Sequence, residues 1–336
     1  MLSEYPKGVL LLATFIALIV ANKIYFRIAL QSGIIDKPNQ RSSHLVPTIR
    51  GGGIVFVLAL LFWAFLHITL YPWFIAGALL IALVSLVDDV RSLAASIRFL
   101  VHLVSIILLG LQVGLFDQPA WIVIPVVVAG VGSINAFNFM DGINGITGIY
   151  GLVNLLTLLF INHEIIYFID DSLLQYVLIS IFVFLFYNFR ERALCFAGDV
   201  GSVTLAFIQV FLVIQLIFST QQFAWVFIFL VFGVDSIITI LYRLRNGENI
   251  FKPHRSHLYQ YLSNEMKQSH LLVSSGYGLL QLAINVMLIV CLPKASVGLV
   301  VFVAACFAVL SVVAREQVLT RLGMKGFWEI SSCSGK

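Results

Sequence analysis

The chain has 336 residues, of which 60% are hydrophobic and only 11% are charged. Soluble globular domains carry about 25% charged residues, so a soluble chain of this composition could not cover its surface with polar groups. Lipid as the solvent for most of the chain explains the excess of apolar residues. The formal net charge of +4 is too small to indicate a nucleic-acid-binding protein.

Apolar stretches recur along the chain and are separated by short polar breaks. Backbone polar groups must be satisfied inside hydrocarbon, and the runs are continuously apolar rather than alternating, so each is expected to be a helix. The sequence predicts an all-α polytopic integral membrane protein, with about 11 transmembrane helices in one domain covering residues 1–336. The predicted spans are 9–30, 51–69, 73–87, 97–115, 121–139, 145–161, 173–187, 201–219, 223–242, 271–291 and 297–314.

The distribution of Lys and Arg predicts the orientation of these helices. Two of these residues, Lys7 and Lys294, fall in one set of loops, and sixteen fall in the opposite set. Because positive charge accumulates on the cytoplasmic side, the sequence predicts an outside N-terminus and a cytoplasmic C-terminus. The predicted cytoplasmic segments are 31–50, 88–98, 188–200, 243–270 and the tail 315–336.

The first polar cluster runs from Asp36 to His44 and continues to the triple glycine Gly51 to Gly53. Its proline and glycines indicate a loop that leads into the second span. Backbone amides of a glycine-rich turn at a helix start suit an anion. An ordinary loop with cytoplasmic positive charge is the alternative.

The second cluster is the pair Asp88 and Asp89, at the predicted cytoplasmic end of the third span. Adjacent carboxylates near a membrane are costly unless they act in chemistry or bind a cation. Magnesium prefers one or two carboxylates together with substrate phosphates. A solvated helix end is the alternative.

The third cluster places Asn135, Asn138, Asp141 and Asn144 at intervals of three residues. If this segment is helical, the four side chains lie along one slowly drifting stripe. Such groups rarely face lipid, so they indicate either a binding site or a polar seam between helices.

The fourth cluster, Phe196 to Ser202, opens the eighth span with Asp199 near its start. Helix amides and a carboxylate at this place suit a metal-bound phosphate, and a simple helix cap is the alternative. The fifth cluster, Phe251 to Gln260, interleaves His and Arg in a pattern that suits phosphate oxygens, with a solvated basic loop as the alternative. Asp235 lies inside the ninth span, where a neighbouring helix could satisfy it or where it could line the site.

These motifs resemble, in chain order, those of the polyprenyl-phosphate N-acetylhexosamine-1-phosphate transferases. Asp88-Asp89 resembles the family's aspartate pair, and Asn135 to Gly145 resembles its Asn-x-x-Asn-x-x-Asp-Gly-x-Asp-Gly run. Gly198 to Ser202 resembles its Gly-Asp-x-Gly-Ser element. Asp235 to Arg243 resembles the family's Asp before a basic helix end, and His254 to Gln260 stands where the family has its histidine-bearing loop.

Two departures resemble one branch of the family. Asn144 stands where many members have a second Asp, and His257-Leu258-Tyr259 stands where many have His-x-His. Both variants, with eleven spans and an outside N-terminus, look like the bacterial branch that starts O-antigen or related polymers and uses GlcNAc or 6-deoxy N-acetyl sugars. They argue against the phospho-MurNAc-pentapeptide branch, which carries a run of histidines.

The resemblance implies a role for each matched residue. Asp88 would act as base or nucleophile with Asp89 in support, and Asp199 would bind Mg²⁺, with Mn²⁺ as a substitute. The nucleotide-sugar would contact Asn138, Asp141, Asn144 and Phe196, the diphosphate His254, Arg255 and His257, and the lipid phosphate Lys37, Arg41 and His44.

The implied reaction transfers N-acetylhexosamine-1-phosphate from a UDP-sugar to undecaprenyl phosphate and releases UMP. It would be the first membrane step of O-antigen, lipopolysaccharide or related cell-envelope synthesis, on the cytoplasmic face of a bacterial inner membrane. Nucleic acid is not an expected partner, and a homodimer is left open.

Two other classes of function remain as alternatives. A transporter or flippase for a phosphorylated or lipid-linked solute predicts polar residues near the bilayer midplane, whereas the carboxylates here fall mostly at one predicted membrane face. A non-catalytic membrane scaffold leaves the one-sided polar clusters unexplained.

Overall fold

The computed structural model describes residues 7–38, 43, 46–250, 252, 254–292, 297–324 and 326. Helices dominate this part of the chain, and its one sheet is the two-residue antiparallel pairing of β1 with β2. In chain order the elements are α1 (Lys7–Ser32), β1 (Ile35–Asp36), β2 (Thr48–Ile49), α2 (Ile54–His67), α3 (Pro72–Val90), α4 (Ala95–Gln112), η2 (Leu115–Asp117), α5 (Ala120–Met140), α6 (Ile146–Glu164), α7 (Asp171–Asn188), α8 (Gly198–Thr220), η3 (Phe223–Phe229), α9 (Leu230–Arg245), α10 (Leu258–Gln260), η4 (Tyr261–Glu265), α11 (His270–Cys291) and α12 (Val297–Arg321).

The helices agree with the predicted membrane spans. Among the described residues, ten helical segments are long and apolar enough to cross a membrane, and the shorter α2 is apolar as well. Together they correspond one by one to the predicted spans, so the predicted all-α membrane fold is confirmed. The ninth span is the 3₁₀ segment η3 followed directly by α9. Which face of the bundle is cytoplasmic remains a prediction.

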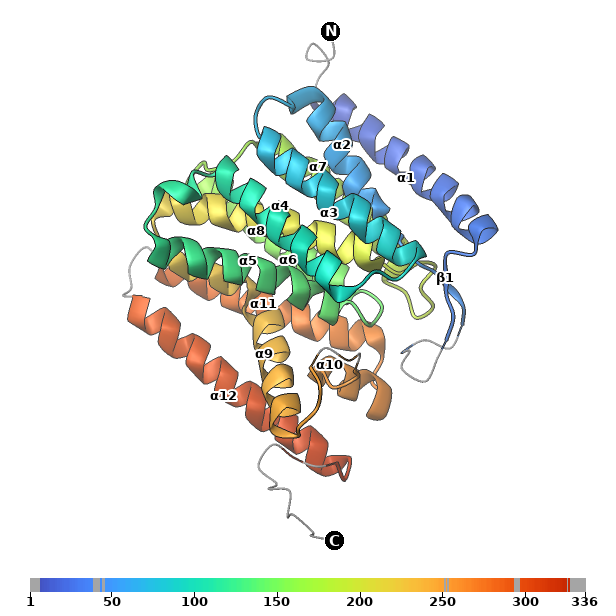
Figure 1. The fold of residues 1–336 in the computed structure, drawn as a ribbon, viewed down its shortest axis with the longest axis vertical. Coiled ribbons are helices and arrows are strands. Elements are labelled where there is room, and N and C mark those ends of the chain that lie inside the picture. The colour runs from blue at the N-terminus through green and yellow to red at the C-terminus, as the bar shows by residue number, and fades with distance from the viewer. Residues whose placement is uncertain are drawn as a thin grey trace.

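Helix α8 forms the centre of the bundle (Figure 1). Of its most apolar 18-residue stretch, 94% is buried, compared with 17% for each of the peripheral helices α1 and α12. Aromatic stacking joins α8 to α3, because the Phe74 ring centroid lies 5.8 Å from that of Phe207 and 4.0 Å from that of Phe211. Helix α8 is therefore packed inside the protein along most of its length.

Buried amides connect α6, α8 and α11 near their midpoints. Asn154 donates to Gln209, at 3.2 Å, and Asn285 donates to Asn154, at 3.3 Å. Gln281 donates to Asn285, at 2.8 Å, and accepts a hydrogen bond of 2.7 Å from Tyr150. Polar side chains that bond one another in this way hold membrane helices together.

The triple glycine has a packing role that differs from the predicted one. The amides of Gly52 and Gly53 donate to the carbonyl oxygens of Phe196 and Ala197, so these two amides are not available to an anion. A Cβ on Gly53 would lie 2.2 Å from the Cα of Gly201, because α2 and α8 approach closely here. Only glycine permits this contact, which brings Arg50 beside the start of α8.

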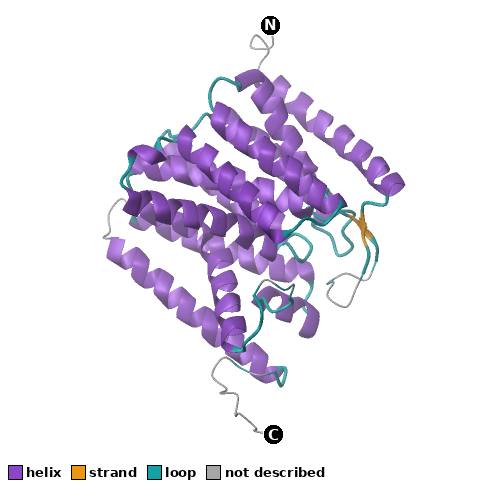
Figure 2. Cartoon of the chain, viewed as in Figure 1, coloured by secondary structure: helices purple, strands orange, loops and turns teal. Residues whose placement is uncertain are grey.

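All the polar clusters with described residues lie at one end of the bundle, called here the site end. The chain leaves α3, α5, α7 and α9 at this end and enters α4, α6, α8 and α11 from it. Figure 2 shows the small sheet and the loops gathered at the same end. Helix α9 runs steeply across its neighbours, between α12 and the other helices (Figure 1).

Replacing Gly201 by Ala tests the contact between α2 and α8. The added methyl group would lie 2.6 Å from the Cα of Gly53, so the helices must separate. Overpacking of this kind costs about 1–3 kcal/mol, and the melting temperature of the detergent-purified protein should fall. Gly132→Ala is the control, because a Cβ there meets nothing within 4 Å. Equal melting temperatures for the two variants would contradict the close contact.

Candidate active site

The side chain of Asp89 is fully buried and joins three segments of the chain. Its Oδ1 accepts hydrogen bonds from Arg50 Nε at 2.6 Å and from the Asp199 amide at 2.9 Å. Its Oδ2 accepts one from the Val200 amide at 2.9 Å. The anion at the N-terminus of α8 is therefore the carboxylate of Asp89, which satisfies two of the free amides at that helix end.

Asp88 and Asp199 lie beside this connection and interact with each other. Arg98 Nη1 lies 3.3 Å from an oxygen of Asp88 and 3.6 Å from an oxygen of Asp199. Arg50 Nη2 is 3.1 Å from the other oxygen of Asp199. The group of Asp88, Asp89, Asp199, Arg50 and Arg98 is called the carboxylate cluster below.

Local structure explains how the aspartate pair is presented. Helix α3 ends at Val90, and the Leu93 amide donates to Asp88 Oδ1. The chain then re-enters the bundle as α4, whose first turn carries Arg98. The short connection thus places a guanidinium beside the carboxylates that precede it.

Asp141 lies just beyond the end of α5 and belongs to the same end of the protein. Its Oδ1 accepts a hydrogen bond of 2.6 Å from Thr147. The pKa of this carboxyl is raised to about 7, mainly by burial and also by the charge of Asp89, against the opposing effects of the Thr147 hydrogen bond and the charge of Arg50. The electrostatic influence of Asp89 and Arg50 links Asp141 to the carboxylate cluster.

The segment from Asn135 to Asn144 is not one continuous helix, so the condition for a single stripe is not met. Helix α5 ends at Met140, and Gly145 adopts a positive φ of 87° before α6 begins. Asn144 instead donates to the carbonyl oxygens of Arg190 and Glu191, at 2.8 and 3.1 Å. Its side chain therefore fixes the loop between α7 and α8, and the glycines break the helical period.

The histidine-bearing loop packs against the end of α5. The Phe139 ring centroid lies 6.4 Å from the imidazoles of both His254 and His257, and these two rings stack 5.1 Å apart. Tyr259 donates to the Phe139 carbonyl oxygen at 3.0 Å. Burial, followed by the charges of His257, Arg243 and Arg315, lowers the pKa of His254 to about 4. His254 is therefore neutral near pH 7.

Asp235 holds this loop from inside the bundle. It accepts hydrogen bonds from the Leu258 amide at 3.1 Å and from Tyr277 at 2.7 Å, and it lies 3.5 Å from His257 Nδ1. Arg315, 1% exposed on α12, lies 4.0 Å from the same carboxylate and donates to Thr239 and to the Ser256 carbonyl oxygen. Of the two roles left open for Asp235, the structure therefore shows the one in which neighbouring helices satisfy it.

The other predicted contact residues differ in accessibility. Phe196 and Asn138 are half-buried at the site end, and Lys37 is exposed. Arg255 is half-buried and pairs with Glu265 at 3.3 Å. The structure thus brings together the carboxylate cluster, Asp141 and the histidine loop. The predicted lipid-phosphate residues Arg41 and His44 lie outside the described residues.

Comparison with known proteins agrees with this arrangement. Residues 71–217 match the family model described as "Glycosyl transferase family 4", and this segment contains Asp88, Asp89, Asp141 and Asp199. The chain is also similar to the "Probable undecaprenyl-phosphate N-acetylglucosaminyl 1-phosphate transferase" of Bacillus subtilis (strain 168), with 27% identity over 276 residues, 75% of this chain and 75% of that protein. Both matches confirm the family resemblance.

Three arginines of this chain had no predicted role in the site. Arg50 and Arg98 bind the carboxylates directly, and Arg315 reaches the histidine loop from the last helix. Arg50 directly precedes the triple glycine, and Arg98 follows Asp88 by ten residues, so proximity to the motifs offered a signal for both. Arg315 offered none, because 80 residues separate it from Asp235.

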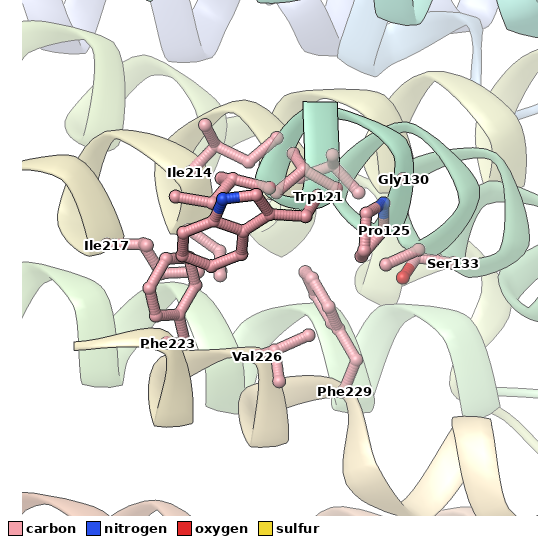
Figure 3. Close-up of a pocket in the computed structure, with 14 residues that line it drawn as sticks. Trp121, Pro125, Gly130, Ser133, Ile214, Ile217, Phe223, Val226 and Phe229 are labelled. Atoms are coloured by element: carbon pink, nitrogen blue, oxygen red, sulfur yellow. The ribbon is translucent and has the colours of Figure 1, made fainter. Parts of the chain in front are cut away.

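An apolar cavity of about 290 Å³ lies between α5, α8 and η3 (Figure 3). Trp121, Phe223 and Phe229 surround it, and no charged side chain lines it. Its α8 residues, Val210 to Ile217, are about 16–27 Å along the helix from Asp199 at 1.5 Å per residue. The cavity is therefore separate from the carboxylate cluster and suited to hydrocarbon.

Replacing Asp235 by Leu tests the buried connection to Arg315. Removing one partner leaves an uncompensated buried charge, which costs about 3–5 kcal/mol, whereas the double variant Asp235→Leu/Arg315→Met should recover part of that loss. Melting temperature in detergent is the measurement. Glu265→Gln is the control, because its pair with Arg255 is exposed and worth less than about 1 kcal/mol. A loss as small as that of the control would contradict the connection.

Asp141 should make the stability of the metal-free protein depend on pH. A carboxyl whose pKa rises from 3.8 to about 7 on folding keeps its proton in the folded state, so the free energy of unfolding falls as pH rises from about 4 to about 7. The slope is about 1.4 kcal/mol per pH unit. Asp141→Asn should remove this part of the slope in denaturant titrations with EDTA. Parallel pH profiles for the two proteins would show that Asp141 does not titrate in this range.

Proposed function

We propose that this protein transfers N-acetylhexosamine-1-phosphate from a UDP-sugar to undecaprenyl phosphate, giving undecaprenyl-diphosphate-sugar and UMP. The observation that carries the proposal is the carboxylate cluster, in which residues up to 149 positions apart meet at one end of a membrane helix bundle. The name of the similar Bacillus subtilis protein supports the same substrates.

The arginines of the cluster are suited to phosphate. Arg50 and Arg98 have exposed side-chain fractions of 35% and 41%, so both remain accessible while paired with Asp89, Asp88 and Asp199. Guanidinium groups bind phosphate oxygens with two parallel hydrogen bonds. If a substrate phosphate replaced the aspartate partner of either arginine, the positive charge of that arginine would still be compensated. Further contacts to the diphosphate would come from His254, Arg255 and His257, which lie on the other side of Asp141 from the carboxylate cluster.

The carboxylate of Asp199 would hold magnesium. It lies beside Asp88 at the N-terminal end of α8, where substrate phosphates would complete the set of oxygen ligands. Mg²⁺ is held in this way by one or two carboxylates together with substrate phosphates and water. Bound there, the ion would neutralise negative charge on the phosphates. Asp89 is fully engaged by Arg50 and α8, so it positions Asp199 rather than binding the ion.

In the proposed reaction, a phosphate oxygen of the lipid forms a bond to the sugar-linked phosphorus of the UDP-sugar, and the bond from that phosphorus to UMP breaks. Phosphate groups occur on both sides, so the protein mainly aligns the reactants and compensates charge. Arg50 and Arg98 compensate charge, and Asp88 either accepts the proton of the lipid phosphate or attacks phosphorus itself. Phe196 and Asn138, half-buried at the site end, would contact the nucleotide.

The remaining assignments follow from the same proposal. The apolar cavity in Figure 3 would receive part of the polyprenyl chain. The site end would face the cytoplasm of a bacterium, where UDP-sugars are made, and the product would begin O-antigen or a related envelope polymer. The bonded amides at the midpoints of α6, α8 and α11 argue against the transporter alternative, because they bond one another instead of lining a polar path.

Asp199→Asn should abolish magnesium-dependent UMP release from UDP-N-acetylglucosamine and undecaprenyl phosphate. Loss of a group that stabilises charge in the transition state costs at least about a hundredfold in rate. Asp117→Asn makes the same chemical change at an exposed carboxylate at the opposite end of the bundle and should leave the rate unchanged. Undiminished UMP release by Asp199→Asn would remove this residue as the metal ligand. Failure of the unmodified protein with every UDP-sugar of a panel would remove the proposed reaction.

A further inference from the structure

A second cavity, of about 550 Å³, lies between α9, α11 and α12. Almost all of its lining is apolar, and its polar lining includes Asp235 and Arg315. An apolar groove of this size between membrane-spanning helices suits a hydrocarbon chain. The carboxylate cluster and the cavity of Figure 3 share no lining residue with it.

The cavity opens to the surface that faces lipid. Leu272, Leu280 and Leu310 line it and are 61%, 49% and 66% exposed. All three belong to helices long and apolar enough to span a membrane. Figure 1 shows α12 at the edge of the bundle beside α9. Hydrocarbon is therefore the medium next to the opening, and an apolar cavity does not retain water.

One end of the cavity contains an unused hydrogen-bond donor. Arg315 is 1% exposed, and its Nη1 and Nη2 donate to Thr239 and Ser256. Its Nε has no acceptor among the described residues. A buried donor without a partner is costly, so an oxygen acceptor brought by a ligand would be favoured here. Asp235 balances the charge of Arg315, so the ligand need not be strongly charged.

The polar end of the cavity lies nearer the membrane surface than its apolar end, as the headgroup of a phospholipid lies nearer the surface than its acyl chains. Arg315 is six residues from the end of α12 at Arg321, or about 9 Å, and Phe307 is about 12 Å deeper. Leu258 and Leu262 close the cavity at the site end, beside Arg315. An ester or phosphate oxygen at Arg315 would therefore be followed by an acyl chain that extends toward Phe307.

We propose that this cavity binds one acyl chain of a membrane phospholipid, with an ester or phosphate oxygen of that lipid at Arg315 Nε. The bound lipid contacts Asp235, Arg315 and Leu258. These residues hold the histidine loop, so the lipid stabilises the position of that loop. Lipid binding itself is independent of the transferase reaction, so the test does not require activity.

Gly276 provides the test, because it lines the cavity and an added Cβ there meets nothing within 4 Å. Gly276→Leu should fill the space without a clash. Gly233→Leu is the matched control: it also has open space, and it lies outside the lining. The proteins are placed in nanodiscs of phosphatidylethanolamine that contain a photoreactive diazirine acyl chain, and labelled peptides are measured by mass spectrometry.

Labelling of residues 272–280 and 307–315 should fall at least fivefold in Gly276→Leu and stay unchanged in Gly233→Leu, relative to labelling of α1. If Gly276→Leu does not fold, Ala314→Phe fills the same cavity from α12. Equal labelling in the filled and unfilled proteins would overturn the proposal. Loss of labelling upon addition of excess undecaprenyl phosphate would also overturn it, because the cavity would then belong to the polyprenyl chain.

Discussion

The carboxylate of Asp89 is buried between the end of α3 and the start of α8, where Arg50 and two helix amides share its charge. A lone carboxylate in this position would be expensive, so the position requires a cation and oriented donors. Arg50 supplies the cation because glycines at 53 and 201 let the chain before α2 approach α8 closely. The placement of Asp88, Asp199 and Arg98 depends on this one buried interaction.

A second buried carboxylate organises the other half of the site in the same way. Asp235 joins α9 to α11 through Tyr277, to the histidine loop through Leu258 and His257, and to α12 through Arg315. The two buried carboxylates thus hold two groups of arginine and histidine side chains, and Asp141 lies between them. Arg315 thereby connects α12 to the histidine loop. Helix α12 itself lies outside residues 71–217, the segment that matches the glycosyl transferase family 4 model.

The polar clusters were visible in the sequence because charged and amide side chains are rare in membrane helices, so Asp88, Asp141 and Asp199 stood out. Readings were left open where backbone geometry decides the outcome. The spacing of Asn135 to Asn144 would form one stripe only in a continuous helix, but α5 ends at Met140. An anion site and an ordinary loop were the two alternatives for the triple glycine, and the amides of Gly52 and Gly53 are bonded to carbonyl oxygens of residues 196 and 197.

The sequence by itself determined the membrane class, the eleven apolar spans and the grouping of polar residues at helix ends and in loops, because hydrocarbon dictates helices of a set length and excludes unpaired charge. Only the tertiary structure decided which charges compensate which. Arg50 and Arg315 neutralise carboxylates 39 and 80 residues away, respectively, and no local pattern encodes such distances. Partners of this kind are set by helix packing, which depends on the shapes of side chains from many segments at once.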